Sequence, residues 1–193
     1  MLAAVRRLFG SRVARAEWLH ARHERRAVLE KLFGAAEDLG PRPSVPFELG
    51  GDAELLLFPQ HIVGARLYVT ADLTTTQPYE LALCVRGDET WPPSAIRRLA
   101  AYCAKQRMHP GDTVRLKSAV PQPSAITGFV FDDYGTFALQ QRRCGVLMAV
   151  GITADELRMS AALGTTALLE ELRGAGVFPF TDLERETITG DAA

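Results

Sequence analysis

The sequence predicts an α+β protein with a mixed, largely antiparallel sheet, helices packed against that sheet, and an N-terminal helix ahead of it. Two observations support this prediction. Apolar residues recur at helical spacing near the N-terminus and again after Gly151, whereas in the middle of the chain they alternate with polar residues, as they do along strands. With 193 residues and 47% apolar content, the chain has the size of one domain with a single core.

The N-terminal segment, residues 1–39, is predicted to be an amphipathic helix from Leu2 to Leu39. Its apolar residues at roughly helical spacing are Trp18, Leu19, Val28, Leu29, Leu32, Phe33 and Ala36. Gly10 and Gly34 are the positions where this helix is most easily interrupted, because glycine is a poor helix former.

A proline-rich linker follows at residues 40–51. Pro41, Pro43 and Pro46 cannot continue a helix, because proline lacks the amide donor and clashes with the preceding turn. The main domain is therefore expected to span residues 52–189, and residues 190–193 are expected to form a frayed tail.

Two alternating segments predict the centre of the sheet. In IVGARLYVTADL, residues 62–73, one face of the strand should be buried and the other wetter. The set expected to be buried is Val63, Ala65, Leu67, Val69, Ala71 and Leu73. The segment YELALCVR repeats the pattern, and the short polar link TTTQP between the two segments favours antiparallel neighbours.

The segment TWPPSAIRRLAAYC, Thr90 to Cys103, predicts a helix that lies across the sheet. Two prolines fit its first turn, where a missing amide donor costs nothing. Its apolar face comprises Ile96, Leu99, Ala100 and Cys103. Trp91 is expected to seal the start of the helix, and Ser94 has no histidine near it in sequence to activate it, so the segment is interpreted as scaffold.

Three further strands are predicted in the second half of the chain, at Thr113–Leu116, Ile126–Asp132 and Val146–Val150. The last is a continuous apolar run, which is typical of a central strand. Asp132 and Asp133 precede Tyr134 and a glycine, a composition that favours a turn between strands over a pair of catalytic carboxylates.

A helix start is predicted at Thr153. Its hydroxyl can cap the helix, Glu156 can return the bond three residues on, and Ile152 can pack on Leu157. Gly164 ends this helix, and TTALLEEL begins a second short helix that Gly174 is placed to stop.

Charge and cysteine usage limit the classes of partner. The net charge of −1 argues against a nucleic-acid partner and against attraction to anionic membranes. Arginines gather in the first forty residues and acidic residues after Gly151, which permits a polar contact between the ends. Cys84, Cys103 and Cys144 are odd in number and far apart, which indicates buried reduced thiols and a cytoplasmic protein. No apolar run is long enough to span a bilayer.

No catalytic, cofactor-binding or metal site is predicted. Glu17, His20 and His23 follow one another at intervals of three residues. A Glu-x-x-His pair of this kind supplies half of the ligands of a carboxylate-bridged two-metal site. No second such pair occurs around His61 or His109. No cysteine pair has zinc spacing, and no glycine-rich phosphate loop or nucleophile elbow is present.

Several segments together resemble the suppressor of fused domain family from Leu55 to the C-terminus. They are RLYVTADLT, YELALCV, WPPSAIRRLAAY, HPGD, GVLMAVGITADELRMSAALGTTALLEELRGAGV and TDLER. Met148–Gly151 depart from the family, which commonly has aromatics and a proline there, so the resemblance is to a divergent bacterial member. The arginine-rich helix before Gly40 lies outside it.

The resemblance implies an α+β fold and a non-enzymatic, protein-binding role without a cofactor. The animal member sequesters a transcription factor through a second, C-terminal half, which this chain lacks, so that role is not carried over. Bacterial relatives resemble immunity proteins of polymorphic toxin systems, and the leading hypothesis is an immunity protein that binds and neutralises a cognate toxin. Trp18, Tyr68, Tyr134 and the arginines are candidate anchors for the partner.

Two other classes stay open. One is a general scaffold or regulatory interaction module, including a homodimer through the N-terminal helix. The other is a small-molecule-binding protein, or an enzyme acting through Asp132, Asp133, Cys84 or a histidine, which would require a pocket enclosing two of these groups.

Overall fold

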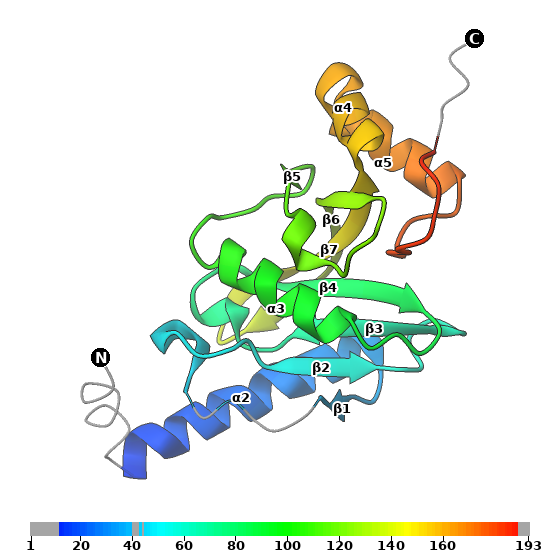
Figure 1. Cartoon of the computed structure of the whole chain (residues 1–193). Helices are drawn as coiled ribbons and strands as arrows, with labels where there is room; N and C mark the ends of the chain where they lie inside the picture. The colour runs from blue at the N-terminus through cyan, green and yellow to red at the C-terminus, as the bar shows by residue number, and fades with distance from the viewer. Residues whose placement is uncertain (1–11, 40–42, 44, 189–193) are drawn as a thin grey trace.

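A computed structural model describes residues 12–39, 43 and 45–188 (Figure 1). Within these residues a seven-stranded mixed sheet runs in the order β1-β2-β3-β4-β7-β6-β5. The strands are β1 (Glu37–Asp38), β2 (Leu55–Phe58), β3 (Ala65–Thr70), β4 (Tyr79–Arg86), β5 (Thr113–Val114), β6 (Ile126–Leu139) and β7 (Arg142–Thr153). The helices are α2 (Arg12–Phe33), α3 (Pro92–Cys103), α4 (Ala154–Leu163) and α5 (Thr165–Gly174). The α+β class predicted from the sequence is confirmed.

Apolar side chains cover both faces of the sheet. Successive residues of a strand point to opposite faces, so alternate residues of β2, β3, β4, β6 and β7 enter two separate cores. One core contains the buried face of α3, and the other contains residues of α2 and α5 (Figure 1). The prediction that one face of β3 is wetter than the other is therefore wrong, since Tyr68 and Thr70 on that face are buried. Val63, expected to be buried, lies before the strand and is fully exposed.

The strand pairing follows the sequence prediction at the centre of the sheet. β3 and β4 are antiparallel neighbours, as the short link between them predicts. β4 and β7 are parallel, and their register extends only from Tyr79 opposite Gly145 to Ala82 opposite Met148. Beyond Ala82 the two strands are no longer paired with each other.

The C-terminal segment, residues 177–188, bonds to both strands beyond this point. The amide of Thr181 donates to the carbonyl of Cys84 on β4 at 2.8 Å. The amide of Gly151 on β7 donates to the Thr181 hydroxyl, also at 2.8 Å. A Cβ on Gly151 would lie 2.6 Å from Cγ2 of Thr181, so the glycine leaves room for the buried Thr181 side chain.

The predicted turn at Asp132 and Asp133 is wrong. Both residues lie inside the long strand β6, which continues to Leu139 and pairs with β7 on either side of a bulge between Asp133 and Gly135. The chain instead reverses at Gln140 and Gln141, which have positive φ angles of 48° and 66°. Hairpin turns of this kind favour Asn-Gly or Gly-Gly, so a Gln-Gln pair gives no turn signal in the sequence.

Helix α2 ends at Phe33, because Gly34 adopts a positive φ of 99°. The predicted continuation to Leu39 is wrong, since Glu37 and Asp38 form the edge strand β1. The predicted helix before Arg12, including Gly10, and the frayed tail at 190–193 lie outside the described residues.

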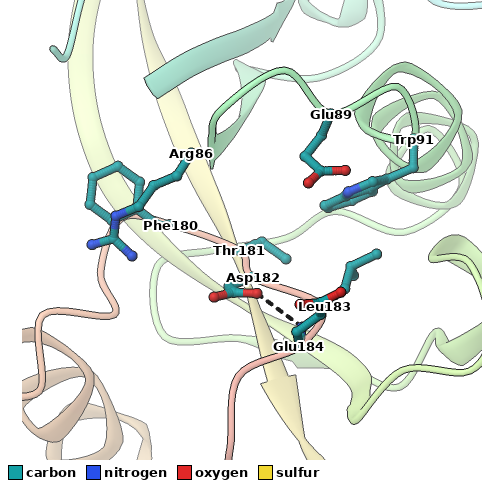
Figure 2. A pocket seen from close by; sticks show the side chains of 8 residues that line it. All are labelled: Arg86, Glu89, Trp91, Phe180, Thr181, Asp182, Leu183 and Glu184. Carbon is teal, nitrogen blue, oxygen red and sulfur yellow. Dashed lines mark hydrogen bonds between the residues drawn. The ribbon is translucent and has the colours of Figure 1, made fainter. Parts of the chain in front are cut away.

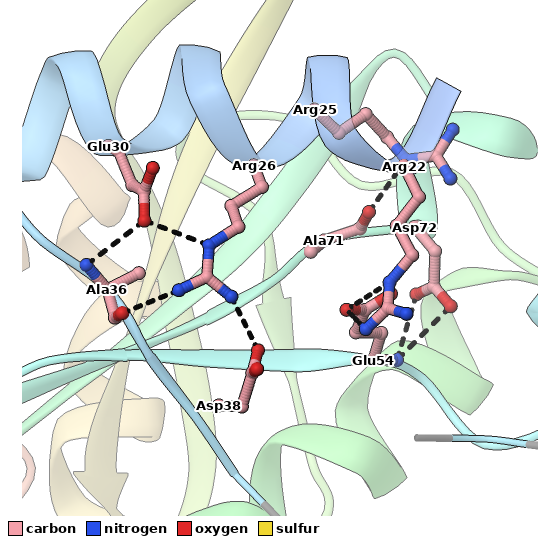
Figure 3. A network of polar contacts seen from close by, with 9 residues as sticks. All are labelled: Arg22, Arg25, Arg26, Glu30, Ala36, Asp38, Glu54, Ala71 and Asp72. Carbon is pink, nitrogen blue, oxygen red and sulfur yellow. Dashed lines mark hydrogen bonds and ion pairs between the residues drawn. The ribbon is translucent and has the colours of Figure 1, made fainter. Parts of the chain in front are cut away.

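Arginines attach α2 to the sheet (Figure 3). Arg22 lies against Glu54, with its Nε 2.6 Å from a carboxylate oxygen, and both side chains are buried. Arg25 donates to the carbonyl of Ala71 at 2.7 Å. These partners belong to the middle of the chain, so the charged residues of α2 fix the helix to its own sheet. Leu29 and Phe33 are buried in the core beneath it.

The predicted capping box at Thr153 and Glu156 is confirmed. The Glu156 carboxylate also accepts from the backbone N–H of Ile188 at 3.0 Å and from both terminal nitrogens of Arg185 at 2.5 Å each. Burial by itself would raise the pKa of Glu156, but Arg185 and the backbone donors outweigh it, so its pKa is lowered. One carboxylate therefore joins the start of α4 to the C-terminal segment.

Replacing Glu156 with glutamine should destabilise the protein by about 3–5 kcal/mol, because Arg185 would keep a buried charge without its counter-ion. Urea unfolding followed by circular dichroism measures this difference. Glu170→Gln is the matched control, since Glu170 is exposed on α5, and it should change stability by less than about 0.5 kcal/mol. Equal stability of the two variants would contradict the role given to Glu156.

Candidate functional site

An open hollow of about 250 Å³ lies where the end of β4, the start of α3 and the C-terminal segment meet (Figure 2). Its lining residues are Arg86, Glu89, Trp91, Phe180, Thr181, Asp182, Leu183 and Glu184. The lining comes from two stretches of chain about ninety residues apart, so the hollow exists only once the C-terminal segment has bonded to the sheet.

One side of the hollow is built by the loop between β4 and α3. The hydroxyl of Tyr68, a buried residue of β3, donates to the carbonyl of Glu89 at 3.3 Å, and Arg66 pairs with Asp88 in the same loop. Trp91 follows directly and packs against the core beneath α3, with part of its indole left exposed. These contacts hold Glu89 and Trp91 in place beside each other.

The other side is built by the C-terminal segment. Thr181 is buried and bonded to both β4 and β7, which fixes the position of the residues that follow it. The carbonyl of Leu183 accepts from the Ser124 hydroxyl at 3.1 Å. A carboxylate oxygen of Asp182 accepts from the amide of Glu184 at 2.9 Å, which closes a tight turn at the rim.

The charges of the hollow are unevenly matched. The guanidinium of Arg86 lies 3.9 Å from the centre of the Phe180 ring and donates to the carbonyl of Gly176. Figure 2 shows this pair on the side of the hollow away from Trp91. Across the described residues, Glu89, Asp182 and Glu184 form no ion pair. The space beside the indole therefore carries a net negative charge.

The lining combines charged, aromatic and aliphatic side chains. The Thr181 hydroxyl is buried and already accepts a hydrogen bond, and no cysteine or histidine lines the hollow. The lining contains a tryptophan, two further apolar residues and an arginine, together with three exposed carboxylates. This composition is typical of the centre and rim of a protein interface.

The sequence predicts Trp91 only as a seal for the start of α3, and the structure gives it a second role as a wall of the hollow. The sequence signal for this role is weak, because an aromatic before two prolines is equally typical of a helix start. Asp182–Glu184 could not be connected with Trp91 from spacing, since only the tertiary structure brings them together.

Of the candidate anchors named from the sequence, Arg86 lines the hollow, whereas the three aromatic residues do not. Tyr68 is buried, and Trp18 is half-buried with Arg22 over its ring. Tyr134 is half-buried, with its hydroxyl 3.0 Å from Nε2 of His61. Burial lowers the pKa of His61 and raises the pKa of Tyr134 to about 12, so both groups are neutral at neutral pH.

The residues considered for catalysis are not brought together in a pocket. Cys84 is fully buried, and desolvation raises its pKa to about 12. Asp132 is paired with Arg173, whose guanidinium also lies over Phe178, while Asp133 is exposed. Cys103 and Cys144 are buried and free, like Cys84.

The metal candidates lie on the surface of α2, where Glu17, His20 and His23 are all exposed. Over residues 12–39, 43 and 45–188, no three His, Cys, Asp or Glu side chains are grouped so that they could hold a metal ion. The helices of the same residues are all too short or too polar to cross a bilayer.

Comparison with known proteins identifies the family. The profile of the suppressor of fused protein family (SUFU) matches residues 65–186, which is more than half of the chain. The chain belongs to the suppressor of fused family. Among curated protein sequences, none matches this suppressor of fused chain.

Solved structures share the suppressor of fused fold. A SUFU homologue from Neisseria gonorrhoeae FA 1090 superposes with a TM-score of 0.67 at 16% identity, over 90% of this chain and 100% of the other. A chain of the Sufu–Fu complex gives a TM-score of 0.65 at 15% identity, over 82% of this chain and 88% of the other. Drosophila Suppressor of Fused gives 0.60 at 16% identity, over 74% of this chain but only 44% of its own. At these identities the likeness shows the fold alone.

Two of the family segments form the hollow. The stretch that begins with Trp91 supplies one wall, and TDLER, residues 181–185, supplies the opposite one. In the same stretch, Arg185 pairs with Glu156 and Thr181 bonds to the separated strands. The suppressor of fused resemblance therefore rests partly on residues that build this site.

A second polar cluster lies inside the suppressor of fused domain, at the base of β4. Glu80 is fully buried and accepts from the amides of Leu73 and Thr74 and from the hydroxyls of Thr70 and Thr74. Both carboxylate oxygens of the neighbouring Asp72 accept from the amide of Glu54. These bonds fix the turn between β3 and β4, so the cluster is structural.

Desolvation raises the pKa of Asp72 to about 8, with repulsion from Glu80 adding to it. Desolvation also raises the pKa of Glu80, against the hydrogen bonds from Thr70 and Thr74. Arg25 lowers the pKa of both groups by its charge, but does not cancel the effect of burial.

Asp72→Asn should remove a pH dependence of stability. Because the folded pKa of Asp72 is raised from 3.8 to about 8, folding retains a proton that the unfolded chain releases. The contribution of protonated Asp72 to the free energy of unfolding is complete below pH 4 and is lost as pH rises to about 8. Over this range the free energy of unfolding falls by up to about 1.4 kcal/mol per pH unit. Asparagine keeps an acceptor for the Glu54 amide and does not titrate, so the variant should be more stable than the wild type at pH 8. Thermal unfolding from pH 5 to 8 measures the stability of the wild type and of the variant as a function of pH, and parallel curves would contradict the role given to Asp72.

Asp133→Asn, at an exposed position, is the control.

Proposed function

We propose that this protein is a non-enzymatic protein-binding domain of the cytoplasm, that the hollow is the centre of its interface, and that its partner is a cognate toxin which it binds and neutralises. The observation that carries the proposal is the composition of the hollow, in which Trp91 and Arg86 are surrounded by exposed charged residues on a rigid frame. Trp and Arg are the residue types that most often dominate binding energy at protein interfaces.

The rigidity of the frame supports this role. Glu89 is held through its carbonyl by Tyr68, and the opposite wall is held by Thr181 and Leu183 through hydrogen bonds to β4, to β7 and to the loop before β6. A preformed interface loses little conformational freedom when the partner docks, so more of the contact energy contributes to affinity.

The burial of the reactive groups also favours binding over catalysis. Cys84 is a neutral thiol inside the sheet, and Asp72 and Glu80 are occupied by backbone and hydroxyl donors. An enzyme needs such groups within reach of a substrate, and these three do not line the hollow.

The proposal of a toxin as the partner is supported by two solved relatives in this family. One solved relative is bacterial, and another was crystallised in complex with Fu. A suppressor of fused domain with a small rigid interface suits an inhibitor that binds a single protein stoichiometrically. The homodimer through the N-terminal helix stays a prediction, which the concentration dependence of the molar mass tests.

The first experiment is a pull-down of the tagged full-length chain from its source cells, read by mass spectrometry with the amounts of each protein quantified. We expect one partner at near-equal amount, toxic when expressed alone and harmless when this chain is co-expressed. A chain recovered alone, or with a partner whose expression is not toxic, would contradict the immunity role.

The hollow is tested with the captured partner. Trp91→Ala and the charge reversal Glu89→Arg should each weaken binding by about 30-fold or more, which corresponds to about 2 kcal/mol. Leu163→Ala is the matched control, because Leu163 is a large exposed apolar residue on α4 outside the hollow. Thermal unfolding of each variant shows whether it is folded. Full binding by both hollow variants would place the interface elsewhere.

A further inference from the structure

We infer that the hollow receives a single cationic side chain, arginine or lysine, from the bound protein. This inference rests on the proposed function, because it names the partner chemistry that the same site recognises. It follows from three properties of the hollow: its charge, the indole that forms one wall, and its size.

The charge of the lining calls for a cation. Glu89, Asp182 and Glu184 line the space, are exposed, and form no ion pair within the described residues. Arg86 is the single basic group of the lining, and its guanidinium is engaged by the Phe180 ring and the carbonyl of Gly176. The lining thus has an excess of two negative charges that face water in the free protein.

Binding of a partner makes this excess of negative charge unfavourable unless the partner supplies a positive charge. A partner that covers the hollow removes water from the three carboxylates, and burying an unpaired carboxylate costs several kcal/mol. An anionic group would add repulsion, and an apolar group would bring the carboxylates neither an opposite charge nor a donor. A guanidinium or ammonium group supplies both the opposite charge and the N–H donors that carboxylate oxygens accept.

The indole gives the cation a second favourable contact. Figure 2 shows Glu89 and Trp91 together on one side of the hollow, with Asp182 and Glu184 facing them from the C-terminal segment. A cation between the two sides would have the indole and Glu89 on one side and Asp182 and Glu184 on the other. The attraction between a cation and a tryptophan face is strengthened when both are shielded from water.

The size of the hollow suits one side chain. Its volume of about 250 Å³ is below the ~300–1,000 Å³ typical of sites for free small molecules. The hollow is also open, so the main chain that carries the cationic residue can remain outside it. A protruding arginine or lysine of a protein surface meets both conditions.

The test uses the full-length chain and a defined probe, the capped tripeptide acetyl-Gly-Arg-Gly-amide. Its binding is followed by the ¹⁵N NMR signal of the Trp91 indole N–H, assigned by comparison with Trp18→Phe, since the chain has two tryptophans. We expect a saturable shift with the arginine peptide. The citrulline peptide, which has the same shape without the charge, and the glutamate peptide should bind at least about tenfold more weakly.

The matched variants separate local from global charge. Glu89→Gln/Asp182→Asn/Glu184→Gln removes the three negative charges of the hollow while keeping its shape, and should weaken binding of the arginine peptide at least about tenfold. Asp133→Asn/Glu170→Gln/Glu171→Gln removes the same number of negative charges from exposed positions outside the hollow, and should bind as the wild type does.

The outcomes distinguish this inference from the proposed function. Equal shifts with the arginine and citrulline peptides, no shift with either, or equal loss in the two triple variants would overturn the cation site. If a toxic partner is then captured and its binding is unaffected by removing the three negative charges of the hollow, protein binding stands and the cation site falls. If the arginine peptide binds as expected but no protein partner is captured, the cation site stands and the protein-binding role falls.

Discussion

The separation of β4 from β7 is the constraint on which the rest of this structure depends. Two parallel strands that stop pairing expose backbone donors and acceptors, and buried groups of this kind must find partners. The C-terminal segment supplies them through Thr181, which bonds to both strands. The segment that satisfies these two central strands also carries the residues that form one wall of the hollow, so the contacts that complete the sheet also form the site.

A single carboxylate secures this arrangement. Glu156 belongs to the capping box of α4, yet it also accepts from Arg185 and Ile188, so the first turn of a helix and the end of the domain share one buried acceptor. A charge buried this deeply is stable only with its counter-ion in place. The direct consequence is that loss of Glu156 would loosen the segment that forms the wall of the hollow.

Polar groups have different roles in different parts of the molecule. Inside the fold, Asp72 and Glu80 accept hydrogen bonds from the turn between β3 and β4, and Arg22 and Arg25 join α2 to the sheet. At the hollow, by contrast, Glu89, Asp182 and Glu184 face water without an ion-pair partner among the described residues. Groups that are satisfied within the chain stabilise it, whereas groups left without a counter-charge on a rigid surface are available to a partner.

The sequence by itself determined the local elements whose signals lie within a few residues: the alternation of β3 and β4, the start of α3 at its prolines, and the capping box at Thr153. The order of these segments also indicated the family. Tertiary structure decided what depends on distant residues. Helices on both faces bury Tyr68 and Thr70, a Gln-Gln turn lets β6 run through Asp132 and Asp133, and an insertion between two strands brings residues 180–184 to Trp91. Spacing along the chain carries no information about such contacts, because they form only when the strands pair and the buried polar groups find partners.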